Sequence, residues 1–227
     1  MHILITAGPT REWLDPVRFL SNPSSGKMGY ALAQAARETG ATVTLVSGPV
    51  TLATPRGVET VRVETAAEMA REVFRRAKRA NIIILSAAVA DWTPATRARQ
   101  KMKKSVISGS VISNQKSEFV LRLKPTVDIA ATLGQSLRPG QVLVGFAAET
   151  QRVEANARGK LERKNFDMIV ANDVSQPGVG FGSDRNEVII VGRDGSVERP
   201  RRASKLALAR RIVKQACAAR AGKMEQP

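Results

Sequence analysis

Short apolar runs alternate with amphipathic stretches along the first two thirds of the chain. The apolar runs predict β-strands, because they are only a few residues long and contain few polar residues. Continuous apolar strands separated by helices are typical of parallel strands covered on both faces. The pattern therefore predicts an α/β fold, a Rossmann-like three-layer sandwich around a mostly parallel, doubly wound sheet. The expected strands are residues 3–6, 43–46, 82–85, 142–146 and 168–170.

The amphipathic stretches predict helices. Thr65 and Glu68 have the spacing of a capping box, in which each side chain binds a backbone N–H of the other residue. Gly40 marks the end of the first helix, because glycine readily adopts the left-handed conformation found there. The expected helices start near Ser25 and continue over 30–39, then cover 66–77 and 153–164, and a last one starts near Ser204.

The last third of the chain departs from this alternation. Residues 187–191 and 196–199 flank Asp194-Gly195, a dipeptide that favours a hairpin turn. We therefore expect a C-terminal antiparallel hairpin before the last helix, and a frayed tail over 218–227. The length of 227 residues and the lack of internal repeats predict a single domain over 1–227.

The composition narrows the class of protein. Hydrophobic residues make up 43% of the chain, enough for a sizeable core. The single cysteine, Cys217, excludes an internal disulfide and favours a cytoplasmic location. No apolar run approaches the roughly 18 residues that a membrane span needs, and Met1-His2 lead directly into a strand without a basic leader. We therefore expect no membrane association.

The net charge of +16 suits either nucleic acid or small anionic substrates. Aromatic residues are only 4% of the chain, so platforms on which bases could stack are scarce. We expect no nucleic-acid partner. The interval 91–118 has no acidic residue inside it but several basic ones, including Lys101, Lys103 and Lys104. It predicts a flexible basic loop, which is either a lid over phosphates or a charged surface.

A candidate phosphate site lies between the first strand and the first helix. Asn22 precedes a run of small residues, Ser24 to Gly29, that leads directly into the helix. Small residues allow backbone N–H groups to approach a phosphate, and the positive end of the helix dipole adds to the attraction. The segment therefore predicts a phosphate cradle.

Further candidates follow other predicted strands, since ligands of open α/β sheets bind beyond the carboxyl ends of the strands. Ala87, Ala88 and Asp91 follow one strand, and Phe146 and Asn172 lie at the ends of two others. The alanines could admit a ligand or simply allow tight packing. Asp91 could bind a hydroxyl, bind a metal ion through water, or cap a helix.

Lys160 and Lys164 share one helix face because they are four residues apart. This pair could bind a triphosphate or belong to a solvated face.

Several chemistries are disfavoured. The only histidine is His2, which argues against a Ser/His/Asp or Cys/His triad. Cys217 fits a small buried hydrophobic residue better than a nucleophile. Met28 stands where a P-loop needs a hydroxyl, and the only tyrosine, Tyr30, lacks the lysine four residues later that a short-chain dehydrogenase needs. Nucleotidyl or phosphoryl transfer without a protein nucleophile remains.

The ordered motifs of the chain resemble those of bacterial phosphopantothenate–cysteine ligase, also called phosphopantothenoylcysteine synthetase. They are ITAGPTRE, DPVRFLSNPSSGKMGYALA, VTLVSGPV, SAAVADW, KMKKS, LVGFAAET, IVANDVS and GFGSDRNEV. The resemblance implies that CTP, with Mg²⁺, activates 4′-phosphopantothenate as an acyl-cytidylate and releases pyrophosphate. L-cysteine then displaces CMP. It also implies a homodimer and, in many bacteria, a flavin-dependent decarboxylase as the other half of the protein.

The resemblance also implies roles for individual residues. Asn22 would stabilise the acyl-cytidylate and aid its conversion, and Lys101 would close on the phosphates. Substrate would contact Asn22, Ala87, Ala88 and Asp91. Nucleotide would contact Ser24, Gly26, Gly29, Ala87, Asp91, Lys101, Val127, Asp128, Ile129, Ala130, Phe146, Lys160, Lys164 and Asn172.

Two positions depart from the family pattern. The segment expected to hold the base reads Thr126-Val127-Asp128-Ile129 where Asn-Pro-Asp-Ile is common, and Pro23 follows Asn22 where His or Arg is more familiar. Pro23 favours an extended backbone at Asn22. A nicotinamide-dinucleotide oxidoreductase on a similar sheet is the alternative function, and a nicotinamide titration would separate the two.

Overall fold

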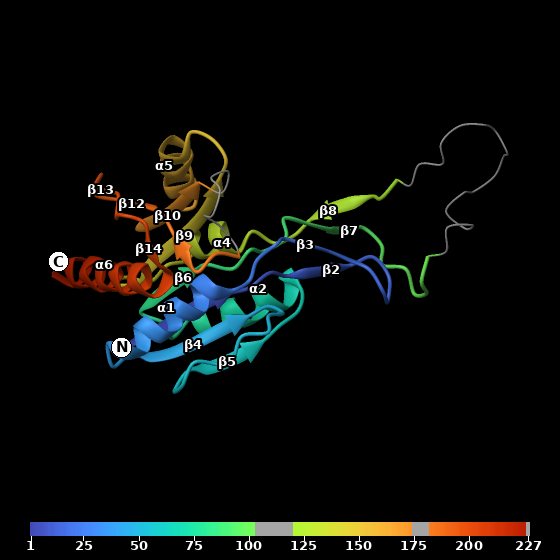
Figure 1. The fold of residues 1–227 in the computed structure, drawn as a ribbon, viewed down its shortest axis with the longest axis horizontal. Coiled ribbons are helices and arrows are strands. Elements are labelled where there is room, and N and C mark those ends of the chain that lie inside the picture. Colours follow the sequence, from blue (N-terminus) through green and yellow to red (C-terminus); the bar gives the residue numbers. More distant parts are fainter. Residues whose placement is uncertain (103–119, 174–181, 226–227) are drawn as a thin grey trace.

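An eight-stranded mixed sheet forms the centre of the protein (Figure 1). The structure is a computed structural model that describes residues 1–102, 120–173 and 182–225. The strand order is β13-β12-β10-β9-β6-β1-β4-β5. The strands are β1 (His2–Ala7), β4 (Thr42–Ser47), β5 (Glu59–Arg62), β6 (Ile82–Leu85), β9 (Val142–Glu149), β10 (Met168–Asp173), β12 (Ile189–Gly192) and β13 (Val197–Glu198).

Six neighbouring strands of this sheet, from β5 to β10, are parallel. β12 and β13 add an antiparallel edge, as the Asp194-Gly195 turn predicted. From β1 the chain moves outward to β4 and β5, then returns to place β6 on the other side of β1. The sheet is therefore doubly wound, and its topological switch point lies between β1 and β6.

Helices cover both faces of the sheet (Figure 1). One apolar cluster joins α1 and α6 to the sheet through residues such as Ile3 and Ile5, while Leu4 belongs to a second cluster on the opposite face. This alternation along β1 is what a strand buried on both faces requires. The helices are α1 (Lys27–Glu38) and α6 (Lys205–Glu225) on the first face, and α2 (Ala66–Ala77), α4 (Ile129–Gln135) and α5 (Val153–Arg163) on the second.

The predicted capping box at the start of α2 is confirmed. Thr65 Oγ1 accepts from the N–H of Glu68 at 3.2 Å, and Glu68 Oε2 accepts from the N–H of Thr65 at 3.2 Å. Two donors that the helix cannot satisfy internally are therefore bound.

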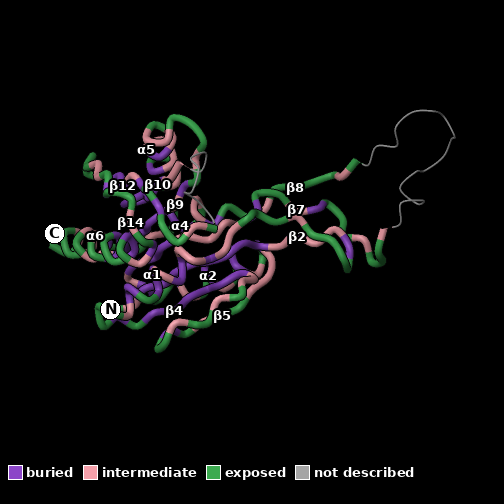
Figure 2. The backbone as a smooth tube through the Cα atoms, in the orientation of Figure 1, coloured by how far each residue is buried: buried purple, intermediate pink, exposed green. Residues whose placement is uncertain are grey.

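An arm of short strands projects from the sheet (Figure 1). It is made of two antiparallel ribbons, β2 with β3 and β7 with β8, and Figure 2 shows much of it as exposed or half-buried. Strands of three residues carry too little pattern to be predicted from the sequence. The arm strands are β2 (Arg11–Trp13), β3 (Phe19–Ser21), β7 (Trp92–Pro94) and β8 (Leu123–Pro125); a third small ribbon near α6 pairs β11 (Arg185–Asn186) with β14 (Ala203–Ser204).

One prediction about the loops is untested over most of its length, and another is wrong. Of the expected loop 91–118, Trp92–Pro94 forms strand β7 and pairs with β8, while residues from 103 onward lie outside the described part. The tail expected to fray from 218 is helical through Glu225. Ala219 packs against the core, and Lys223 Nζ binds Asp167 Oδ1 at 2.6 Å and the Gln141 carbonyl at 2.9 Å. These tertiary contacts hold the end of α6.

Among the described residues, every helix is too short or too polar to cross a membrane.

Candidate functional site

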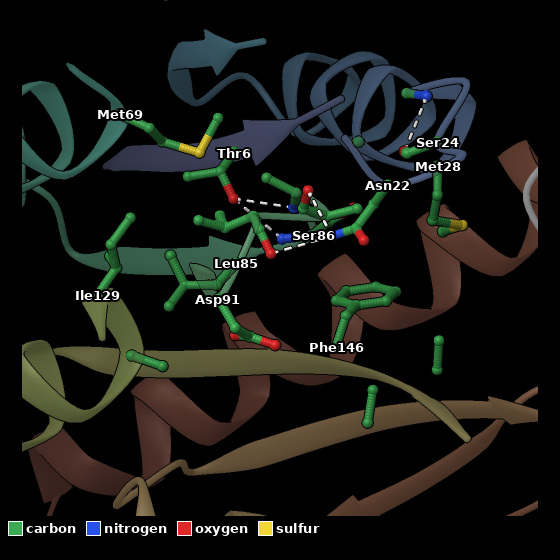
Figure 3. A pocket seen from close by; sticks show the side chains of 18 of the residues that line it. Thr6, Asn22, Ser24, Met28, Met69, Leu85, Ser86, Asp91, Ile129 and Phe146 are labelled. Carbon is green, nitrogen blue, oxygen red and sulfur yellow. Dashed lines mark hydrogen bonds between the residues drawn. The ribbon is translucent and has the colours of Figure 1, made fainter. Parts of the chain in front are cut away.

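A cavity of about 960 Å³ opens beyond the carboxyl ends of β1, β6, β9 and β10 (Figure 3). It lies at the switch point of the sheet, where open α/β sheets bind ligands. All but one of the residues that the sequence marked as a site line it. They are Asn22, Ser24, Gly26, Gly29, Ala87, Ala88, Asp91, Val127, Asp128, Ile129, Ala130, Phe146, Lys160, Lys164 and Asn172.

The predicted cradle is the turn that begins α1. Gly26 is the N-cap residue with φ of +74°, and no side chain caps the helix. A Cβ on Gly26 would lie 2.8 Å from Val50 Cγ1, so both the backbone conformation and the space require glycine. The first N–H groups of α1 therefore border the cavity as donors for an anion.

Gly29 has a packing role in addition to the one expected. It is buried, and a Cβ there would lie 2.5 Å from Ala7 Cβ and 2.9 Å from the Thr6 carbonyl oxygen. Gly29 therefore allows α1 to approach β1 closely, which brings the start of the helix to the carboxyl end of that strand.

Threonine hydroxyls fix the loop after β6. Thr6 Oγ1 accepts from the N–H groups of Ser86 and Ala87, both at 3.1 Å. Thr10 Oγ1 accepts from the N–H of Ala90 at 2.9 Å, and Thr126 Oγ1 donates to the Ala90 carbonyl at 2.7 Å. The alanines of SAAVAD thus line the cavity on a backbone held by hydrogen bonds.

The Asn22 side chain connects the segment before α1 to the loop after β6. Its Nδ2 donates to the carbonyls of Ala88 at 3.3 Å and Val89 at 3.1 Å (Figure 3). The amide therefore lies at the cavity wall, where the sequence placed it. Its two donors are occupied in this arrangement, so donation to a substrate oxygen requires the amide to exchange one of these carbonyls.

Asp91 does not cap a helix, because strand β7 follows it directly. The Asp91 backbone carbonyl accepts from the N–H of Thr126 at 2.9 Å. Asp91 is among the residues that line the cavity (Figure 3). Within the described ranges, no three His, Cys, Asp or Glu side chains gather as metal ligands.

The two predicted lysines each pair with a carboxylate beside the cavity. Lys160 Nζ lies 2.6 Å from Glu149 Oε1, and Lys164 pairs with Asp128. Asp128 also caps α4 by accepting from the N–H of Ala131 at 2.9 Å. Burial raises the pKa of Asp128, but the Lys164 ammonium and the Ala131 N–H lower it by more, so its pKa lies below the ordinary value.

The segment Val127 to Ala130 lines the cavity although it departs from the family pattern. It forms the start of α4, where Asp128 is the cap residue in extended conformation. Asp128, which the chain shares with the family pattern, caps this helix.

Lys101 is the exception among the predicted residues. It is exposed and does not line the cavity. Its neighbour Met102 is bound at the arm: the Met102 N–H donates to Asp15 Oδ2 at 3.2 Å, and Arg18 Nη2 donates to the Met102 carbonyl at 2.7 Å.

Several lining residues were not predicted. Lys27, Asn186 and Lys205 contribute polar groups, and Thr6 and Ser86 complete the wall near Asn22. Lys27 and Asn186 lie within the motifs SSGKMG and GFGSDRNEV, but a motif alone does not tell which side chain faces a cavity. Lys205 lies in no quoted motif.

Two residues that the sequence set aside also lie outside this cavity. Tyr30 Oη lies 3.1 Å from Ser47 Oγ and accepts from Arg62 Nη1 at 2.6 Å. Burial raises the pKa of the Cys217 thiol, which the positive charge of Arg220 lowers in part. A raised pKa disfavours the thiolate, so Cys217 is a packing residue.

A doubly wound α/β domain with an anion cradle at its switch point belongs to the class of phosphate- and nucleotide-binding domains. The chain matches the model of the DNA/pantothenate metabolism flavoprotein C-terminal domain over residues 1–219. It belongs to this family.

The chain is also similar to individual proteins with assigned names. The coenzyme A biosynthesis bifunctional protein CoaBC of Bacillus subtilis is 52% identical over 195 residues, covering 86% of this chain and 45% of the relative. CoaBC of Escherichia coli K12 is 50% identical over 195 residues, covering 86% and 46%. This chain thus spans about half the length of these curated relatives.

Solved structures extend the comparison to the fold. The crystal structure of the C-terminal domain of a CoaBC protein has a TM-score of 0.77 at 43% identity, covering 94% of this chain and 92% of that one. A Cab2 mutant in complex with phosphopantothenate-cysteine has a TM-score of 0.78 at 18% identity and shares the fold.

Proposed function

We propose that this chain joins 4′-phosphopantothenate to L-cysteine at the expense of CTP, giving 4′-phosphopantothenoylcysteine. The observation that carries the proposal is that one cavity gathers the cradle, Asn22, the SAAVAD loop, Phe146 and the two lysines of α5. These come from distant parts of the sequence, in a chain of the family to which CoaBC C-terminal domains belong.

In the first step, a carboxylate oxygen of 4′-phosphopantothenate attacks the α-phosphorus of CTP, and the bond to the β-phosphate oxygen breaks to release pyrophosphate. The cradle N–H groups and Lys160 and Lys164 would orient the nucleotide and balance its charge. Such positioning and preorganised charge supply most of the catalysis in transfers at phosphorus.

In the second step, the amine of cysteine attacks the acyl carbon, CMP leaves as the carbon–oxygen bond breaks, and the new amide nitrogen loses a proton to solvent. The Asn22 amide would donate to the oxygen on which negative charge develops. The hydrogen bonds from Asn22 to the Ala88 and Val89 carbonyls support this role, since Ala88 is among the residues expected to contact the substrate.

Magnesium would enter with the nucleotide. Within the described ranges the cavity offers two carboxylates, Asp91 and Asp128, of which Asp128 pairs with Lys164, and no cluster of three ligands. That donor set fits Mg²⁺, which is commonly bound by one or two carboxylates, substrate phosphates and water. The ion would neutralise charge on the triphosphate.

Lys101 is proposed to close on the phosphates, although it is exposed outside the cavity in this structure. Lys101→Ala is expected to lower turnover while the melting temperature is unchanged. Arg99→Ala, on the same exposed stretch, is the matched control. Equal rates of product formation in Lys101→Ala and the original protein would remove Lys101 from the mechanism.

We also propose a homodimeric, cytoplasmic enzyme. The arm exposes Val17, Phe19, Trp92 and Leu123, an apolar surface suited to a second copy. The relatives are about twice as long, which fits a flavin-dependent decarboxylase as the other part of a bifunctional protein.

The deciding experiment supplies the purified chain with 4′-phosphopantothenate, cysteine, CTP and Mg²⁺, and measures pyrophosphate, CMP and product. We expect one pyrophosphate and one CMP for each product. Absence of product above background would refute the proposed reaction. ATP, GTP and UTP in parallel test the preference for CTP, and NAD in a binding titration tests the oxidoreductase alternative.

A further inference from the structure

The cavity has a second group of lysines, at the end opposite to Lys160 and Lys164. Lys27 is the first residue of α1 and Lys205 the first residue of α6, and both line the cavity. Since α1 and α6 pack together on one face of the sheet, their first residues lie at the same part of the cavity, close enough for the two lysine charges to interact.

Lys205 is the more unusual of the two. It is only 7% exposed. Burial lowers its pKa, the Lys27 ammonium lowers it further, and the Asp184 carboxylate raises it in part. Burial and the neighbouring Lys27 ammonium both disfavour the charged form of Lys205, and an anion bound beside the two lysines would favour that form.

One segment, Gly182 to Asp184, contacts both lysines. Lys27 Nζ lies 2.6 Å from Asp184 Oδ1 and donates to the Gly182 carbonyl at 3.1 Å. The N–H of Lys205 donates to the Asp184 carbonyl at 3.0 Å. This segment belongs to the motif GFGSDRNEV, for which the proposed function has no use so far.

From this geometry we infer that Lys27 and Lys205 form a cationic subsite for the terminal phosphates of the nucleotide, with Asp184 as a positioning residue. The inference rests on the proposed function. Lys27 directly follows Gly26 of the cradle. If one phosphate of the nucleotide binds the cradle N–H groups, the next phosphate along the triphosphate can therefore reach Lys27. The base would lie across the cavity, at Val127 to Ala130 beside the start of α4.

The subsite has a chemical consequence. When the acid attacks the α-phosphorus, the departing pyrophosphate takes the electron pair of the broken bond. Two ammonium groups at that end of the cavity stabilise the added charge on the leaving group without transferring a proton.

The test compares Lys205→Met with Lys214→Met, a control at an exposed position on the same helix that does not line the cavity. Calorimetric titrations with CTP, CMP and inorganic pyrophosphate, each with Mg²⁺, and with 4′-phosphopantothenate give the affinities. Lys205→Met should weaken CTP and pyrophosphate binding by about tenfold or more, but CMP binding by less than about twofold. The lost charge-assisted contact is to the terminal phosphates, which CMP lacks.

Equal loss for CTP and CMP, or no loss for either, would overturn the subsite. A loss confined to 4′-phosphopantothenate would show that the lysines bind the phosphate of that substrate instead. Lys27→Met, at a side chain that is 35% exposed, provides a second variant if Lys205→Met does not fold. Pyrophosphate binding needs no turnover, so failure of the ligase assay and failure of this subsite are separate results.

Discussion

At the residue scale, the site contains residues whose immediate neighbours restrict which side chain can stand at that position. Gly26 needs both a positive φ and empty space, and Gly29 sits against the backbone of β1. Asn22 is held by two carbonyl groups of the SAAVAD loop. Each of these residues can therefore be tested by a substitution that changes one or two atoms.

Asn22→Asp removes the amide donor while nearly preserving the shape of the side chain. We expect the cysteine step to slow by about 100-fold or more, the usual effect of losing an oxyanion donor, and acyl-cytidylate to accumulate. Quenched-flow analysis with labelled CTP measures the intermediate. Asn22→Ala, which adds no charge near the carbonyls, is the control. Unchanged turnover in both variants would exclude a catalytic role for Asn22.

Gly29→Ala is expected to destabilise the protein by about 1–3 kcal/mol, because the added methyl group meets Ala7 and the Thr6 carbonyl. Gly159→Ala in α5 is the matched control. Its methyl group would meet only the end of the flexible Arg163 side chain at 3.1 Å, and alanine favours the helix by about 1 kcal/mol. Urea unfolding gives both values; equal effects at the two positions would contradict the close approach of α1 to β1.

At the element scale, a buried carboxylate, Asp15, connects several segments of the arm by hydrogen bonds. Asp15 is fully buried and accepts from Arg18 Nη2 at 2.6 Å, from the Val17 N–H at 2.8 Å and from the Met102 N–H at 3.2 Å. Burial raises the pKa of Asp15, but the guanidinium and the backbone N–H groups lower it by more. Its pKa therefore lies well below the ordinary value.

A carboxyl group whose pKa is lowered by folding stabilises the folded state above its unfolded pKa. This contribution is lost as the pH falls through the folded pKa. Asp15→Asn should therefore reduce the unfolding free energy most near pH 7, and the gap to the original protein should narrow as the pH falls below about 4. Urea titrations at several pH values measure this gap. A gap that is independent of pH would contradict the ionised Asp15.

The sequence predicted long elements better than short ones for a physical reason. The strand Ile82–Leu85 and the helix Ala66–Ala77 are found where their apolar periodicity placed them. The ribbons of the arm exist because β7 pairs with β8 across 28 intervening residues, from 95 to 122, and three residues carry no periodicity that reveals it.

At the scale of the whole molecule, the proposed dimer would use the arm as its interface. Val17 is 56% exposed and Leu123 40% exposed on a part that projects from the sheet (Figure 1). If the arm forms the dimer interface, Val17→Asp and Leu123→Asp should each shift the protein toward monomer, because a carboxylate would be buried without a partner.

Sedimentation velocity measures this shift. Met224→Asp, at a residue 62% exposed near the end of α6, should remain dimeric and serves as the control. A dimer that persists in both arm variants would place the interface elsewhere, and a monomer in the original protein would refute the dimer itself.

The sequence by itself determined most strands of the sheet, most of the helices, and 15 residues that the structure places at the cavity; it missed β5 and α4. The features that it determined are properties of local periodicity and of motifs whose residues can be read one by one. Even Ser24 to Gly29 was recognisable as a cradle from its small residues and the helix that follows.

Tertiary structure alone decided which side chains share the cavity. It moved Lys101 outside, paired Lys160 and Lys164 with Glu149 and Asp128, and brought in Lys205 from the last helix. Residues such as Lys27 and Lys205 are 178 positions apart in the chain and meet only because α1 and α6 pack on the same face of the sheet. A local sequence pattern cannot predict that two such distant residues lie close together, since this proximity follows from the order in which the strands and helices are wound around the switch point.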